Sequence, residues 1–179
     1  MTSWTILFAV ACLFTAVAGA IDVRTGLIPN RLTLTLLGLG VPAHVLVLYA
    51  STPRVSPWLW AADAIGGVVI CSLVPLLLWR TGGMGGGDLK LFAALGAWLG
   101  VRAGLEVQLV AFAVAALGAP ALLAYRGRLW AFLRNLGRQL INPLLPKHRR
   151  QQPPQELLTE LRFGPVIFAG TLLVACVRL

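Results

Sequence analysis

The chain has 179 residues, of which 58% are hydrophobic and 12% charged, whereas ordinary soluble domains have about 45–50% apolar and about 25% charged residues. So few charged groups exclude a secreted domain, a disordered protein and a conventional soluble enzyme. The net charge of +9 would by itself suggest nucleic acid, but in so apolar a chain a bilayer containing anionic lipid is the expected partner. We therefore expect an all-α polytopic membrane protein that binds no nucleic acid.

Long uncharged stretches predict about six membrane-spanning helices, because a helix needs about 20 mostly apolar residues to cross the hydrocarbon. The first stretch lacks a basic amino-terminal region, which favours an uncleaved helix over a signal peptide. The fourth carries Asp88 and Lys90 at its start. The predicted spans are residues 2–21, 32–50, 57–79, 86–101, 105–125 and 163–177.

Residues 126–162 form the long polar connection between the fifth and sixth predicted spans. Within it, leucines recur at helical spacing and predict an amphipathic helix lying in the membrane interface. These leucines are Leu129, Leu133, Leu136 and Leu140. The following stretch, residues 143–154, is rich in Pro, Gln and Arg and is predicted to be a flexible loop.

The basic residues predict the orientation of the chain. Twelve of the fifteen lysines and arginines fall on one set of alternating connections, and three fall on the other. The three are Arg54, Arg102 and Arg178. Because cytoplasmic loops carry an excess of basic residues, we expect the first set to be cytoplasmic and both termini to lie outside. This places the basic loop, residues 126–162, in the cytoplasm.

The six acidic residues are few enough to interpret singly. Asp63 lies near the outer end of the third span, where it can reach the interface or a polar neighbour. Glu106 follows Arg102 by four residues on a helix, the spacing of an ordinary ion pair. Glu156 and Glu160 lie in the polar loop and are expected to be solvated. These four favour structural over catalytic roles.

Asp22 and Asp88 differ because both are predicted at the cytoplasmic ends of spans, and therefore at the same membrane depth. Two carboxyl groups side by side in a medium of low dielectric constant can share one proton. One can then act as general base on a water molecule while the other, protonated, polarises a carbonyl. A shared membrane depth is only suggestive evidence for a catalytic pair, because several charged residues line the cytoplasmic face of any such protein.

Glycines directly precede the second of these aspartates, at Gly82, Gly83, Gly85, Gly86 and Gly87. Glycine lets another backbone approach closely, as a substrate strand being cut requires, and irregular backbone at membrane depth is tolerated where it lines a cavity. An ordinary loop explains the glycines alone equally well.

After the first aspartate, Pro29 suits a helix start and Asn30 can cap a helix or orient a neighbour. The three cysteines stand singly, so neither a metal site nor a redox motif is expected.

Three motifs, in order along the chain, resemble those of the prepilin peptidases, which are GxGD-type intramembrane aspartyl proteases. They are Asp22 with residues 28–30, the stretch 83–91, and residues 163–165. The resemblance implies a single peptidase domain over residues 1–179 that cleaves the short basic leader of type IV or Flp-type prepilins or pseudopilins at the cytoplasmic face of a bacterial inner membrane. It implies Asp22 and Asp88 as the catalytic pair and no cofactor.

The same resemblance implies that Gly85 and Gly87 shape the turn that presents Asp88. Further candidates for substrate-binding or site-shaping residues are Gly83, Pro29, Asn30 and Lys90, and no catalytic role is expected for Lys90. Larger members of the family carry a cysteine-rich insertion near the first spans and also N-methylate the new terminus. This chain has no such insertion, so it looks like the short form associated with Flp or Tad pilus systems, and methyltransferase activity is not expected.

Two other classes of function remain open. A proton-coupled transporter could use the aspartates as relays around a glycine-broken helix. However, the two halves of the sequence show no inverted repeat, and the acids are not spread along a path across the membrane. A non-enzymatic membrane subunit of a pilus or secretion assembly would explain the spans but gives the paired acids no purpose. The sequence does not indicate an oligomeric state.

Overall fold

The computed structural model describes residues 3–125 and 162–178. It divides the chain into two units, of which the first contains residues 1–114 and 162–179 and the second contains residues 115–161. Of the second unit, the structure describes residues 115–125, which continue a helix begun in the first. The predicted amphipathic helix and the flexible loop lie outside the described residues.

All regular elements in the described part of the chain are helices, which confirms the predicted all-α class. They are α1 (Ser3–Thr25), α2 (Asn30–Ser51), α3 (Pro57–Arg80), α4 (Gly86–Tyr125) and α6 (Phe163–Arg178). Four of them contain segments long and apolar enough to cross a membrane, and α6 is a shorter apolar helix. The protein is therefore a polytopic, membrane-embedded helical protein.

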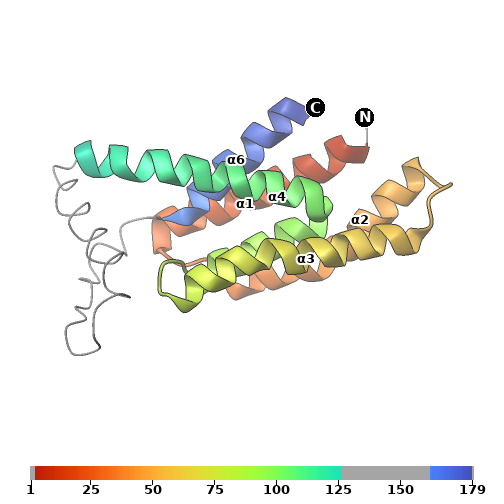
Figure 1. Ribbon diagram of the computed structural model, residues 1–179, viewed down its shortest axis with the longest axis horizontal. Coiled ribbons are helices and arrows are strands. Elements are labelled where there is room, and N and C mark those ends of the chain that lie inside the picture. Colours follow the sequence, from red (N-terminus) through yellow and green to blue (C-terminus); the bar gives the residue numbers. More distant parts are fainter. Residues whose placement is uncertain (1–2, 126–161, 179) are drawn as a thin grey trace, which may run out of the picture. The chain divides into compact units, whose positions relative to one another are not determined.

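Helix α4 is broken at Gly100, whose φ of 71° and ψ of −174° are not helical. Its two arms fold back on each other, because a Cβ placed on Gly104 would lie 3.2 Å from the Cα of Gly96. Further from the break on both arms, the rings of Phe92 and Phe112 contact each other with centroids 5.5 Å apart. The reversal of α4 is visible in Figure 1. It falls where the sequence predicts the fourth span to end, near residue 101.

Side chains from α2 and α3 bind the backbone groups next to this break. The Val101 N–H donates a hydrogen bond of 3.2 Å to Oδ1 of Asp63, and Nδ1 of His44 lies 2.9 Å from the carbonyl oxygen of Trp98. The Nε2 atom of His44, a fully buried residue, is 3.3 Å from Oδ2 of Asp63. Since a helix break leaves backbone groups without their helical partners, this pair replaces them. Asp63 therefore has a polar neighbour, His44, which is one of the two environments expected for it from the sequence.

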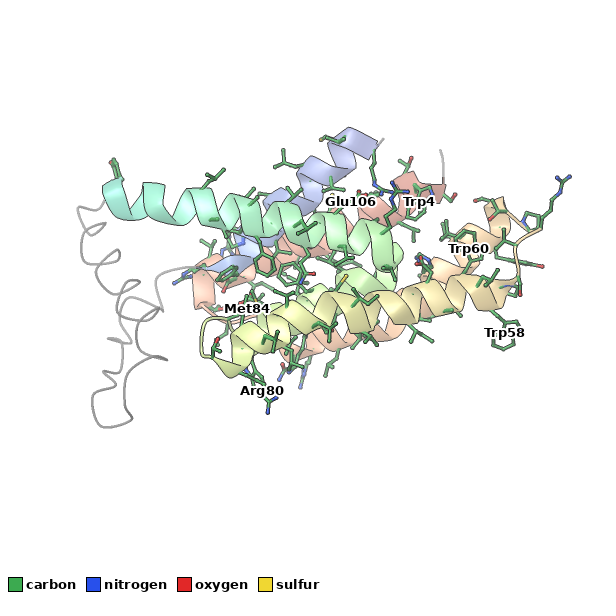
Figure 2. The ribbon with its side chains drawn as sticks, viewed as in Figure 1. Trp4, Trp58, Trp60, Arg80, Met84 and Glu106 are labelled. Atoms are coloured by element: carbon green, nitrogen blue, oxygen red, sulfur yellow. The ribbon has the colours of Figure 1, made fainter. Side chains whose placement is uncertain are left out.

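The first unit has two distinct ends. Helices α1 and α6 run antiparallel, and both α1 and α3 finish at the end where α4 and α6 begin (Figure 1). Figure 2 shows Arg80 and Met84 at this end, whereas Trp4, Trp60 and Glu106 lie toward the opposite end. Close backbone contacts join the helices between the two ends: a Cβ on Gly67 of α3 would collide with the backbone of Gly96 in α4. Small residues at such crossings are typical of membrane helices.

At the opposite end, Glu106 of α4 accepts hydrogen bonds of 2.6 and 2.7 Å from Arg178 of α6. Its ion pair with Arg102, expected from their spacing, is also present at 3.5 Å. The Arg178 guanidinium lies 6.0 Å from the ring centroid of Trp4 in α1. These contacts connect three helices far from the end that carries Asp22 and Asp88.

Candidate active site

Asp22 lies in the last turn of α1 and is buried, with 6% of its surface exposed. The helix continues beyond the predicted span, to Thr25, and ends at Gly26, whose φ is 71°. The Gly26 N–H donates a 2.8 Å hydrogen bond to the carbonyl oxygen of Asp22. A left-handed glycine after the last turn is a common helix stop. The aspartate therefore projects from a regular helix just before its end.

Asp88 lies in the first turn of α4 and is also buried, with 9% of its surface exposed. Gly85, directly before α4, lies beside the Asp88 carboxylate. A Cβ on Gly85 would lie 3.0 Å from Oδ2 of Asp88, so a side chain there would press on the carboxylate. Gly85 therefore shapes the immediate surroundings of Asp88.

The two aspartates, 66 positions apart in the sequence, come from different helices to the same end of the unit. They are close enough for the charge of Asp22 to act on the carboxyl group of Asp88. Buried carboxyl groups interact strongly because the surroundings screen charge poorly. The structure thus brings together the two acids that the sequence placed at one depth.

The connection between α1 and α2 supports this arrangement. Ile28 is buried, and a Cβ on Gly87 would lie 2.9 Å from the Cβ of Ile28. The residue before Asp88 therefore packs directly against the chain that follows Asp22. Pro29 is the N-cap residue of α2, in keeping with a helix start.

Two predicted residues form a contact that the sequence did not reveal. The Lys90 ammonium donates a 2.7 Å hydrogen bond to Oδ1 of Asn30, which joins the first turn of α2 to α4. Gly83 has a different position: its N–H donates to the carbonyl oxygen of Leu78 and ends α3. Of the predicted glycines, Gly85 and Gly87 therefore contact the surroundings of Asp88, whereas Gly83 terminates the preceding helix.

Sequence reasoning missed two residues beside Asp22. The N–H of Gly164, in the first turn of α6, donates a 3.0 Å hydrogen bond to Oδ2 of Asp22. The Arg162 guanidinium donates to the carbonyl oxygens of Asp22 and Val23. The motif at residues 163–165 was the signal that pointed to this region. It did not indicate which earlier residue the segment contacts.

The polar groups at this end of the unit are two carboxylates, backbone amide N–H groups and cationic side chains. Within residues 3–125 and 162–178, no group of three or more His, Cys, Asp and Glu side chains is placed to hold a metal ion. The arrangement suits acid–base chemistry by a carboxyl pair.

Comparison with known proteins identifies relatives of this chain. Residues 9–120 match the type IV leader peptidase family. The chain is 36% identical over 136 residues to a prepilin leader peptidase/N-methyltransferase of Xanthomonas campestris pv. campestris, covering 75% of this chain and 42% of that protein. It is 40% identical over 86 residues to the leader peptidase HopD of Salmonella typhimurium, covering 48% of this chain and 54% of that protein.

An archaeal protein, the prepilin peptidase EppA of Methanothermobacter thermautotrophicus, is 38% identical over 74 residues, covering 41% of this chain and 18% of that protein. The chain thus spans less than half the length of the Xanthomonas relative. No solved structure matches the chain.

Proposed function

Because the chain belongs to the type IV leader peptidase family, we propose that it is an aspartyl endopeptidase that removes the short basic leader from type IV or Flp-type prepilins or pseudopilins. The observation that carries the proposal is the pair of buried aspartates, Asp22 and Asp88, contributed by α1 and α4 to one end of the helical unit. A buried pair of carboxyl groups can hydrolyse a peptide bond without a metal ion, because one group can act as general base on water and the other as general acid.

In the proposed reaction one carboxylate takes a proton from water while the other carboxyl group, protonated, donates to the oxygen of the scissile carbonyl. The resulting hydroxide attacks the carbonyl carbon, and the tetrahedral intermediate collapses as a proton passes to the leaving amine. No covalent acyl-enzyme forms. At Gly85, the missing Cβ leaves the side of the Asp88 carboxyl group open for an extended substrate backbone, whereas Gly87 packs against Ile28.

We also propose that the end carrying the aspartates faces the cytoplasm of a bacterial inner membrane, with both termini outside. Basic residues at this end support the orientation, since Arg24 lies in the last turn of α1, Arg31 lies in the first turn of α2 and Arg80 is the last residue of α3. The same residues would attract the anionic lipid headgroups of that leaflet. A cytoplasmic site matches a substrate whose basic leader stays in the cytoplasm.

Processing of a prepilin tests the function directly. The chain is co-expressed with each of a panel of tagged Flp-type prepilins, and leader removal is followed by gel shift and mass spectrometry. Asp22→Asn and Asp88→Asn should each abolish cleavage while the protein still inserts, because neither amide can carry the required proton. Asp63→Asn is the matched control on α3 and should leave most of the activity, because an asparagine oxygen can still accept the hydrogen bond from Val101.

Cleavage at the wild-type rate by either active-site variant would contradict the assignment. Failure of the wild-type chain to cut any prepilin of the panel would contradict it as well. The processed pilin should carry an unmodified amino terminus, since we propose the peptidase activity alone; a methylated terminus formed by this chain would add the second activity that the Xanthomonas relative's name states.

A further inference from the structure

We propose that Arg162 and Gly164, at the start of α6, are positioning residues that hold the Asp22 carboxylate toward Asp88. The inference rests on the proposed peptidase function and assigns a role to a segment 140 positions away in the sequence. The proposed role is to orient one catalytic carboxylate. Two carboxyl groups that together activate water must be held in a fixed orientation relative to each other.

Gly164 acts on the carboxylate itself. Its N–H belongs to the first turn of α6, where amide groups have no partner within the helix and the helix dipole presents partial positive charge. The 3.0 Å hydrogen bond to Oδ2 therefore both directs and stabilises the negative charge of Asp22. A Cβ at this position would lie 2.8 Å from the Cβ of Asp22 and 2.9 Å from Oδ2. Only glycine lets the helix start approach this closely.

Arg162 acts on the backbone beneath the carboxylate. Carbonyl groups in the last turn of a helix can accept hydrogen bonds from outside it, and that of Asp22 already accepts one from the Gly26 N–H. In α1, the Arg162 guanidinium binds two carbonyl groups near that end, those of Asp22 and Val23. The planar guanidinium offers several donors in a fixed geometry, so it can hold two carbonyl oxygens at once. Asp22 is thus held twice, through its main chain by Arg162 and through its side chain by Gly164.

The helices themselves do not depend on this contact. Helix α1 packs against α6, and α6 buries Ile167, Thr171 and Val174 further along its length. Removing one guanidinium at the end of this pair should therefore leave the two helices assembled. A positioning role and a purely structural role consequently make different predictions for the enzyme.

The test measures kcat and KM for leader removal from a purified, tagged Flp-type prepilin by the full chain in detergent. Arg162→Gln and Gly164→Ala should each lower kcat roughly 10- to 100-fold, the effect expected when a catalytic group is misplaced by less than about 1 Å. KM should change less than about threefold, because substrate binding is not removed. Arg162→Lys should recover part of the lost rate, because the ammonium keeps the charge and can donate to one carbonyl.

Two matched controls accompany these variants. Arg24→Gln removes an exposed cation from the same end of α1, and Gly38→Ala adds a methyl group where no atom lies within 4 Å. Both should retain kcat within about twofold. Thermal unfolding in detergent, measured for every variant, separates a misplaced carboxylate from a destabilised protein.

The outcomes distinguish this inference from the function on which it rests. Wild-type kcat in Arg162→Gln and Gly164→Ala, while Asp22→Asn remains inactive, would overturn the inference alone. A fall in kcat that only follows a lower folded fraction would assign the segment a structural role and overturn it too. Cleavage by Asp22→Asn would overturn the peptidase assignment and this inference together.

Discussion

A glycine lies against each of the two aspartates: the Gly164 N–H donates a 3.0 Å hydrogen bond to Asp22, and Gly85 lies beside the Asp88 carboxylate. An added Cβ would lie 2.9 Å from Oδ2 of Asp22 at position 164 and 3.0 Å from Oδ2 of Asp88 at position 85. The glycines therefore let the backbone, rather than a flexible side chain, orient the acids. Backbone donors are fixed by the helices that carry them, so they lose little entropy in holding a charged group.

At Gly87, substitution is expected to disturb the site through a neighbour. Gly87→Ala places its Cβ 2.9 Å from the Cβ of Ile28, so the chain following Asp22 has to move relative to Asp88. We expect leader cleavage to fall about tenfold or more, as for other sub-ångström displacements of catalytic groups. The measurement is the initial rate of processing in detergent.

Gly86→Ala is the neighbouring control for this substitution. Its Cβ would lie 3.4 Å from Nε1 of Trp79, an ordinary contact at the edge of a ring. It should keep most of the activity. Equal rates for the two alanine variants would show that the packing of Gly87 on Ile28 does not matter for cleavage.

At the scale of residues, the sequence indicated the two acids but not what holds them. Asp22 and Asp88 stand out because acids are scarce and because both fall at span ends. The contacts of Arg162 with the end of α1, and of Lys90 with Asn30, depend on which helices become neighbours. Helix neighbours in a bundle are decided by packing across the whole unit, which hydropathy along one chain does not report.

Among the helices, α4 departs most from a simple span. Hydropathy indicates apolar segments on both sides of residue 101, and the structure joins them into one element with a break at Gly100. The sequence alone does not single out Gly100 among 19 glycines. Its role follows from Asp63 and His44, which come from two other helices and meet at the break. This contact between helices depends on the tertiary structure, so the sequence around Gly100 contains no local pattern that indicates it.

Replacing this glycine tests how much the break contributes to stability. Gly100→Ala has to adopt a φ of 71°, and its Cβ would collide with the Asp63 carboxylate. A non-glycine residue with this combination of φ and ψ costs about 1–3 kcal/mol before any collision is counted. We therefore expect the free energy of unfolding to fall by at least about 2 kcal/mol. Denaturation in detergent, followed by circular dichroism, measures it.

Gly38→Ala serves as the comparison, because it lies in α2 with free space around its Cα. Alanine has the higher helix propensity, so this variant should be as stable as the wild type or up to about 1 kcal/mol more stable. If the two alanine variants unfold alike, the turn at residue 100 is not the constrained point that its geometry indicates.

Across the whole molecule, the proposed orientation predicts which ends can be labelled from outside. Single cysteines are introduced as Arg54→Cys and Arg80→Cys in a background where Cys12, Cys71 and Cys176 are replaced by alanine. A membrane-impermeant maleimide should label position 54 in intact spheroplasts, whereas position 80 should react only after permeabilisation. The reverse pattern would invert the topology and place the aspartates on the outer face.

The break in α4 also sets the length of the helical arm that carries Asp88. From Asp88 to Gly100 the helix rises about 18 Å, and from Asn30 to His44 α2 rises about 21 Å. The hydrocarbon core of a typical bilayer is about 30 Å thick. Helices α1, α2 and α3 are long enough to cross the bilayer, whereas the first arm of α4 is shorter than the hydrocarbon core. Lipid beside that arm has to become thinner, or one end of the arm has to lie below the level of the headgroups.

Acyl-chain length should consequently regulate this protein. In vesicles of phosphatidylcholines with chains of 14, 16, 18 and 20 carbons, leader cleavage should be fastest in the shorter lipids and decline as the bilayer thickens, because each added ångström of mismatch has an energetic cost. Rates that do not vary with chain length would show that the aspartates reach the aqueous boundary without deforming the membrane. A protease whose short helix arm sets its depth would thus respond to the mechanics of the surrounding lipid as well as to its substrate.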